Sequence, residues 1–122
     1  MIKIEGIVKK GIRDFTKRFN NYPNVFKEIT GVDLYPGTIN VEVTLPVEVK
    51  EDFRIKGSKI NEPNQDLIFE KCEINGYMAF RIRPYNIYTG EGGWGDNILE
   101  ISSTTFIPDL VEGSIVEITL FR

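Results

Sequence analysis

Residues 34–41 read Leu-Tyr-Pro-Gly-Thr-Ile-Asn-Val, a turn that runs directly into a strand. Pro36 presets φ at the first corner of the turn, and Gly37 accepts a positive φ at the second. Because side chains alternate along a strand, Thr38 and Asn40 point to the same face. A hydroxyl and an amide oxygen there suit a hard cation such as Mg²⁺, which takes its other ligands from water and phosphate. The same spacing also suits a plain hairpin turn with two solvated polar residues.

Short runs of alternating apolar and polar residues continue through the chain and are typical of strands. Asn75-Gly76 separates two of these runs and is a strong signal for a two-residue hairpin. Pro23 suits the first turn of a short helix that an asparagine caps, and Gly31 suits its C-cap. Residues 57–65 have no apolar pattern and predict a surface loop. The predicted strands cover residues 2–10, 39–45, 47–56, 67–74, 77–83, 98–102 and 114–121.

These elements predict a single domain over residues 1–122, a mainly β fold built as a small six- to seven-stranded β-barrel with one short helix. A chain with 41% hydrophobic and 27% charged residues has the composition of a globular protein with a core. No apolar run approaches the roughly 18 residues of a membrane span, and residues 1–5 alternate like a strand rather than a signal peptide. Cys72 is the single cysteine, which favours a cytoplasmic protein, and we interpret it as a small core residue.

The distribution of charge favours a small anionic ligand over a nucleic acid. The net charge is −3, which argues against wholesale binding of a polyanion. The first nineteen residues nevertheless carry six basic and two acidic side chains, giving +4 there and −7 over the rest of the chain. Such a basic segment suits a small anion, and it equally suits a solvated surface loop. A less favoured alternative is an oligonucleotide-binding barrel with a basic and aromatic face, formed by Arg81, Arg83, Tyr85 and Tyr88.

The residue types narrow the chemistry to reactions that need no imidazole. The chain contains no histidine, which excludes histidine general bases and Ser-His triads. Phosphoryl transfer remains open, because it needs mainly positioning and charge neutralisation, with a carboxylate to orient the nucleophile. Glu100 is the best candidate for that carboxylate, since it lies in the apolar run 98–101. Strand alternation alone also places one outward polar residue there.

Three segments together resemble the archaeal-type CTP-dependent riboflavin kinases. They are Gly6-Ile7-Val8 after Glu5, the helix-like run 25–31 that ends in Gly, and Tyr35 through Asn40. The resemblance is good over residues 4–45, loose over 66–85 and partial over 96–121. Members of that family are of similar size and fold as small cradle-loop β-barrels, which agrees with the barrel predicted above.

The resemblance implies an activity, a cofactor and a set of site residues. The reaction is transfer of a nucleotide γ-phosphate, from CTP, to riboflavin to give FMN, with Mg²⁺ as the cofactor. Thr38 and Asn40 would hold the metal, and Glu100 would lie beside the flavin and orient its hydroxyl. Trp94 would stack on the flavin ring or serve as a loop anchor. The residues expected to face the nucleotide phosphates are Lys10, Gly11, Arg13 and Lys17.

The sequence also departs from the family at two segments. The first loop of the family is rich in glycine, whereas residues 10–19 contain Gly11 as the only glycine and several basic side chains. The segments on either side of Glu100 also differ. A non-catalytic ligand-binding or interaction barrel that keeps the fold is therefore the alternative function.

Overall fold

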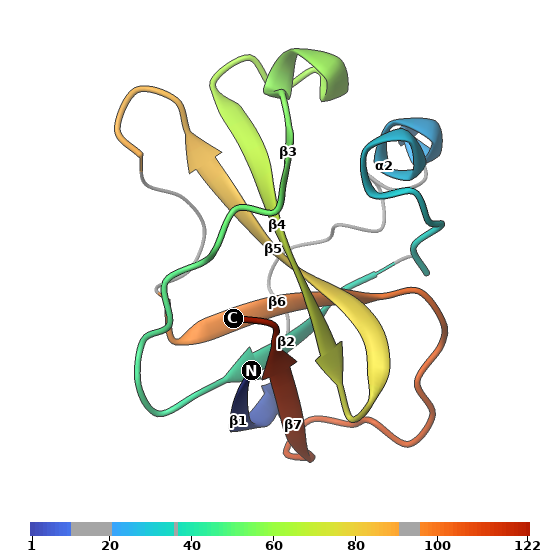
Figure 1. Ribbon diagram of the computed structural model, residues 1–122, viewed down its shortest axis with the longest axis vertical. Coiled ribbons are helices and arrows are strands. Elements are labelled where there is room, and N and C mark those ends of the chain that lie inside the picture. The colour runs from blue at the N-terminus through green and yellow to red at the C-terminus, as the bar shows by residue number, and fades with distance from the viewer. Residues whose placement is uncertain (11–20, 36, 91–95) are drawn as a thin grey trace.

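The computed structural model describes residues 1–10, 21–35, 37–90 and 96–122 as a mainly antiparallel β structure (Figure 1). These residues also form one short α-helix, α2 (Pro23–Thr30), and a 3-10 helix, η1 (Gly57–Ile60). None of the helices in this part of the chain is long and apolar enough to cross a membrane. The seven strands are β1 (Ile2–Lys9), β2 (Ile39–Glu42), β3 (Phe53–Ile55), β4 (Gln65–Ile74), β5 (Tyr77–Asn86), β6 (Ile98–Ser103) and β7 (Ile115–Leu120).

Six of these strands close into a barrel, which confirms the predicted fold class. Hydrogen bonding follows the order β3-β4-β5-β6-β2-β1-β7, and β7 returns to pair with β4. One edge of β4 therefore has two partners: Leu67 to Phe69 pair with β3, and Cys72 to Ile74 pair with β7. β3 is the extra strand outside the closed ring.

Both faces of β4 and β5 are buried, one in the barrel interior and one beneath α2 and η1. The interior cluster includes Val41, Cys72 and Leu99, each 0% exposed. The second cluster joins Phe26 of α2 to Phe69 and Phe80, whose rings meet edge to face. Double-sided burial explains why these two strands are rich in large apolar residues. In Figure 1, α2 and η1 both lie in the upper part of the view, near β3.

The hairpin, the helix C-cap and the opening turn follow the sequence prediction. Asn75 and Gly76 both have positive φ, 49° and 82°, as a type I′ turn between β4 and β5 requires. α2 ends at Gly31, whose φ is 79° and whose N–H bonds to the carbonyl of Lys27 at 2.7 Å. Gly37 also has a positive φ, 105°. The predicted asparagine N-cap is wrong: Tyr22 occupies that position, and its side chain makes no capping hydrogen bond.

Three predictions of element bounds are also wrong. The strand predicted over residues 47–56 is limited to β3, Phe53–Ile55. Residues 57–65 are not simply a surface loop, because Gly57 and Ile60 of η1 are buried. A single turn is too short for its apolar side to show as a periodicity. Strand β2 ends at Glu42, short of the predicted end at residue 45, and Leu45 is 74% exposed. Beyond β2 the Val43 N–H bonds to the carbonyl of Asn97, which is a single contact and not a ladder.

Asp66 ties η1 and β3 to β4. Its buried carboxylate accepts the Gly57 N–H at 2.8 Å and an Arg54 N–H at 2.9 Å. Burial alone would raise the pKa of Asp66, but these hydrogen bonds and the Arg54 charge leave it below the ordinary value of 3.8. Gly57 has no room for a side chain, since a Cβ would lie 1.9 Å from the carbonyl oxygen of Glu62.

We expect Asp66→Asn to lower the free energy of unfolding near pH 7 and to have little effect in acid. Because the folded-state pKa of Asp66 is lowered, its contribution is present above pH 3.8 and is lost as pH falls through the folded value. Urea unfolding of both proteins from about pH 7 down to about pH 2.5 measures this difference. Asp33→Asn, at an exposed ion pair with Lys27, is the control. An equal loss of stability in Asp66→Asn at every pH would show that the charge of the Asp66 carboxylate does not stabilise the fold.

Candidate active site

Asn40 and Glu100 lie directly opposite each other on neighbouring strands. β2 pairs with β6 so that Asn40 is the register partner of Glu100. Side chains of such partners share a face, with Cβ atoms roughly 4.5–5.5 Å apart. The register thus brings together two predicted site residues that are sixty positions apart in the sequence. Thr38, two residues before Asn40, is half-buried just ahead of β2.

The polar side chains on this face are buried. Asn40 is 4% exposed, Glu100 is 3% exposed and Ser102 is 0% exposed. Asn40 Oδ1 and Ser102 Oγ have no hydrogen-bond partner among the residues that the structure describes. Such an atom costs about 1–3 kcal/mol relative to a satisfied one. The face therefore holds two buried oxygen atoms whose hydrogen-bonding capacity the described residues leave unused.

The oxygen atoms of Thr38 and Asn40 are the right type for Mg²⁺. Hard cations take neutral and carboxylate oxygens, and Mg²⁺ is commonly held by one or two protein groups together with substrate phosphates. The buried Oδ1 of Asn40 fits that requirement. Within the described residues, no three acidic or cysteine side chains gather into a cluster that would form an all-protein metal site. Any Mg²⁺ here would therefore depend on ligands from the substrate.

A small pocket opens beside Thr38. It has a volume of about 180 Å³, and Ile39, Ile101 and Ile107 form part of its apolar wall. Tyr35 and Phe106 lie at the same pocket with ring centres 5.6 Å apart. Both rings are exposed. Ile39 and Ile101 are register partners that alternate with Asn40 and Glu100, so this pocket opens on the opposite face of β2 and β6 from the Asn40–Glu100 pair.

The other predicted site residues have mixed outcomes. Lys10 is exposed and directly follows β1, which is the strand that pairs with β2. Gly11, Arg13, Lys17 and Trp94 lie outside the described residues, so their roles stay predictions.

Sequence reasoning missed Lys9 and Ser102, which share the polar face. Lys9 is the register partner of Asn40 on β1, so a cation, an amide and a carboxylate lie in one row across three strands. The Lys9 ammonium pairs with Glu42 at 3.9 Å. Ser102 could have been found from alternation, because it lies two residues after Glu100 on the same strand. No local signal reveals Lys9, because its place depends on register.

The alternative basic and aromatic face is wrong. Arg81 is only 1% exposed and points into the barrel, where its Nη2 lies 3.7 Å from Asp96. Arg83 pairs with the same carboxylate. The Arg54 guanidinium lies 4.6 Å from the ring centre of Tyr85. Burial outweighs the nearby carboxylates and lowers the pKa of Arg81 to about 10, so the group stays charged at neutral pH.

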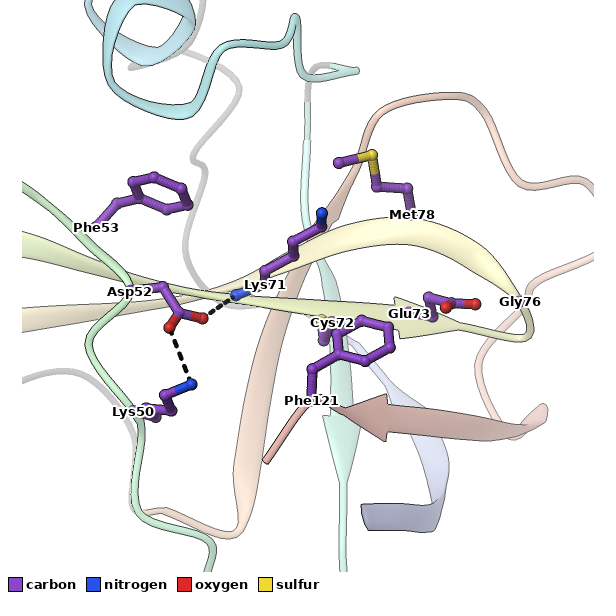
Figure 2. A pocket seen from close by; sticks show the side chains of 9 residues that line it. All are labelled: Lys50, Asp52, Phe53, Lys71, Cys72, Glu73, Gly76, Met78 and Phe121. Carbon is purple, nitrogen blue, oxygen red and sulfur yellow. Dashed lines mark hydrogen bonds and ion pairs between the residues drawn. The ribbon is translucent and has the colours of Figure 1, made fainter. Parts of the chain in front are cut away.

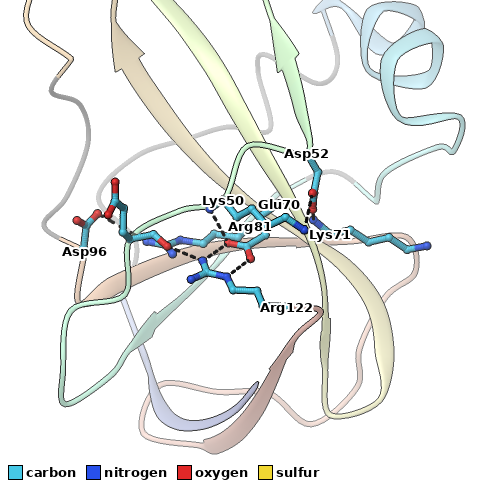
Figure 3. A network of polar contacts seen from close by, with 8 residues as sticks. Lys50, Asp52, Glu70, Lys71, Arg81, Asp96 and Arg122 are labelled. Atoms are coloured by element: carbon cyan, nitrogen blue, oxygen red, sulfur yellow. Dashed lines mark hydrogen bonds and ion pairs between the residues drawn. The ribbon is translucent and has the colours of Figure 1, made fainter. Parts of the chain in front are cut away.

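Glu70 is the central acid of this buried network (Figure 3). Its carboxylate, 1% exposed, accepts two N–H groups of Arg122, both at 2.8 Å, and the backbone N–H of Lys50 at 3.0 Å. The hydrogen bonds to Glu70 outweigh burial and raise the pKa of Arg122. Burial also raises the pKa of Cys72, to about 12, which confirms it as a core thiol without nucleophilic character.

No model of a known protein family matches this sequence, and no curated protein matches it either.

We expect Glu70→Leu to destabilise the barrel by about 3 kcal/mol or more, because it leaves the Arg122 guanidinium without its acid and removes a nearby negative charge from the buried Arg81. Chemical unfolding at neutral pH measures the change. The matched control is Glu51→Gln, which removes an exposed partner of Arg54 and should cost no more than about 1 kcal/mol. Equal losses for the two variants would show that burial of the network has no energetic role.

Proposed function

We propose that this protein is a Mg²⁺-dependent phosphotransferase that moves the γ-phosphate of a nucleotide to riboflavin to form FMN. CTP is the nucleotide donor that we propose. The observation that supports this most directly is the register pairing of Asn40 with Glu100. A prospective metal ligand and a prospective catalytic carboxylate share one buried face of the sheet, and Thr38 lies beside them. The resemblance of Tyr35 through Asn40 to the riboflavin kinases points to Thr38 and Asn40, and the resemblance of the run 98–101 points to Glu100.

Each of these side chains has a defined task. Asn40 Oδ1 and Thr38 Oγ1 supply neutral oxygens for the metal, which when bound neutralises charge on the phosphates. The Glu100 carboxylate accepts a hydrogen bond from the acceptor hydroxyl and directs that oxygen at the γ-phosphorus. Its burial excludes water from competing for the same hydrogen bond.

The basic residues near the end of β1 supply charge for the phosphates. Lys10 lies one residue after Lys9, which is in the same row as Asn40 and Glu100. Gly11, Arg13 and Lys17 follow it in the sequence and would complete the phosphate contacts. Trp94 would stack on the flavin. Catalysis would then rest on alignment and charge neutralisation, as phosphoryl transfer allows.

The test is to incubate the purified protein with CTP or ATP, Mg²⁺ and riboflavin and to measure FMN by chromatography. We expect FMN to form, and Glu100→Gln to lower kcat by about 100-fold because the carboxylate that orients the acceptor hydroxyl is lost. Glu117→Gln, on the exposed face of β7, is the control and should leave kcat unchanged. Asn40→Leu should raise the Mg²⁺ concentration for half-maximal activity by about tenfold or more.

Absence of FMN with either nucleotide, in a protein whose far-UV circular dichroism shows the folded barrel, would contradict the proposal. Riboflavin binding without FMN formation would instead favour the non-catalytic barrel. An unchanged Mg²⁺ concentration for half-maximal activity in Asn40→Leu would remove Asn40 from the metal site while leaving the role of Glu100 intact.

A further inference from the structure

A second, larger pocket lies on β4 away from the Asn40–Glu100 pair. Its volume is about 730 Å³, within the range of small-molecule sites. Apolar walls come from Phe53 at the start of β3, Met78 of β5 and Phe121 just after β7 (Figure 2). These three side chains come from three separate parts of the chain, so only the folded barrel presents them together.

The floor of the pocket is the place where β4 changes partner. β3 pairs with β4 as far as Phe69, and β7 pairs with it from Cys72. The Asp52 carboxylate covers the junction: it accepts the backbone N–H of Lys71 at 2.9 Å and pairs with the Lys50 ammonium at 3.3 Å. The backbone N–H of Lys71 at the junction is thus already satisfied by a side chain of the same protein.

Two charged groups at the pocket have no such partner. Lys71 and Glu73 lie two residues apart on one face of β4. Neither side chain forms a hydrogen bond or ion pair with the residues that the structure describes. Figure 2 shows the Lys71 ammonium directed between Phe53 and Met78, and the Glu73 carboxylate directed toward Gly76. The pocket therefore presents one cation and one anion that point apart, together with apolar walls.

We propose that this pocket binds a small zwitterion with an apolar body, of the size and charge separation of a dipeptide with two apolar side chains. The Cα atoms of residues two apart in a strand are about 6.4–6.8 Å from each other, which sets the scale of the separation between the two charges. An extended dipeptide spans about 7 Å between its ends. Its carboxylate pairs with Lys71, its ammonium pairs with Glu73, and its side chains pack against Phe53, Met78 and Phe121. This site is separate from the proposed phosphotransfer site and does not depend on that function.

Calorimetric titration of the whole protein with Leu-Phe tests the proposal, with two capped forms of the same peptide as probes. N-acetyl-Leu-Phe lacks the ammonium and Leu-Phe-amide lacks the carboxylate. We expect Leu-Phe to bind and each capped form to bind at least about tenfold more weakly. Backbone amide shifts in NMR should move at Phe53, Lys71, Glu73 and Phe121. Because the capped peptides probe the unaltered chain, the result does not depend on the folding of a variant.

Lys71→Met and Glu73→Gln then separate the two contacts. Lys71→Met should weaken Leu-Phe by about tenfold but should not weaken Leu-Phe-amide further, since the same interaction is already lost. Glu73→Gln should behave in the same way toward N-acetyl-Leu-Phe. Lys59→Met and Glu112→Gln, at exposed positions outside the pocket, are the matched controls. Absence of binding at millimolar peptide, equal affinity of capped and free peptides, or NMR shifts confined to other residues would each overturn the proposal.

Discussion

The barrel depends on the division of one edge of β4 between two strands. Leu67 to Phe69 bond to β3 and Cys72 to Ile74 bond to β7, so Glu70 and Lys71 have no strand opposite them on that edge. Acidic side chains supply hydrogen-bond acceptors at this point. Asp52 accepts the backbone N–H of Lys71, and Glu70 accepts the backbone N–H of Lys50 and N–H groups of the Arg122 guanidinium. Because β7 closes the ring through β4, these contacts hold the segment between β2 and β3 against the closed barrel. They also orient the floor of the larger pocket.

The buried charges in the barrel interior determine which single substitutions the protein tolerates without loss of stability. Glu70 and Arg81 are register partners on β4 and β5, and each is 1% exposed. Arg81 and Arg83 both pair with Asp96. These two ion pairs hold Asp96 in place two residues before β6 begins. Arg81 Nη1 has no hydrogen-bond partner among the described residues, so this guanidinium is incompletely satisfied. Removing one partner of a buried ion pair costs more than replacing the whole pair by apolar side chains. A single substitution in this network is therefore expected to lower the free energy of unfolding strongly, even if the intact network adds little net stability.

Local signals account for the parts of the fold that the sequence predicts. Asn75-Gly76 determines the hairpin because both residues accept positive φ, and Gly31 ends α2 for the same reason. The paired site residues Asn40 and Glu100 were each identified, but their direct opposition follows from the register of β2 on β6. Lys9, Arg81 and η1 depend on non-local packing, which no single segment encodes. Arg81 in particular follows the pattern of an exposed strand position, because alternation cannot distinguish a solvated face from a second buried one.

The buried polar face of β2 and β6 is costly for a purely structural surface. Valine or isoleucine at Asn40 would fill comparable space and leave no unsatisfied oxygen, and the neighbouring position Val41 shows that β2 accepts such residues. The chain instead keeps Asn40, Glu100 and Ser102 together at 4% exposure or less. Buried polar atoms without partners among the described residues, here Asn40 Oδ1 and Ser102 Oγ, concentrate where a protein binds or transforms a ligand, since the ligand supplies the missing interaction. A Mg²⁺-phosphate group at this face would satisfy Asn40 Oδ1, which is why we attach the proposed phosphotransfer to this face and not to the larger pocket on β4.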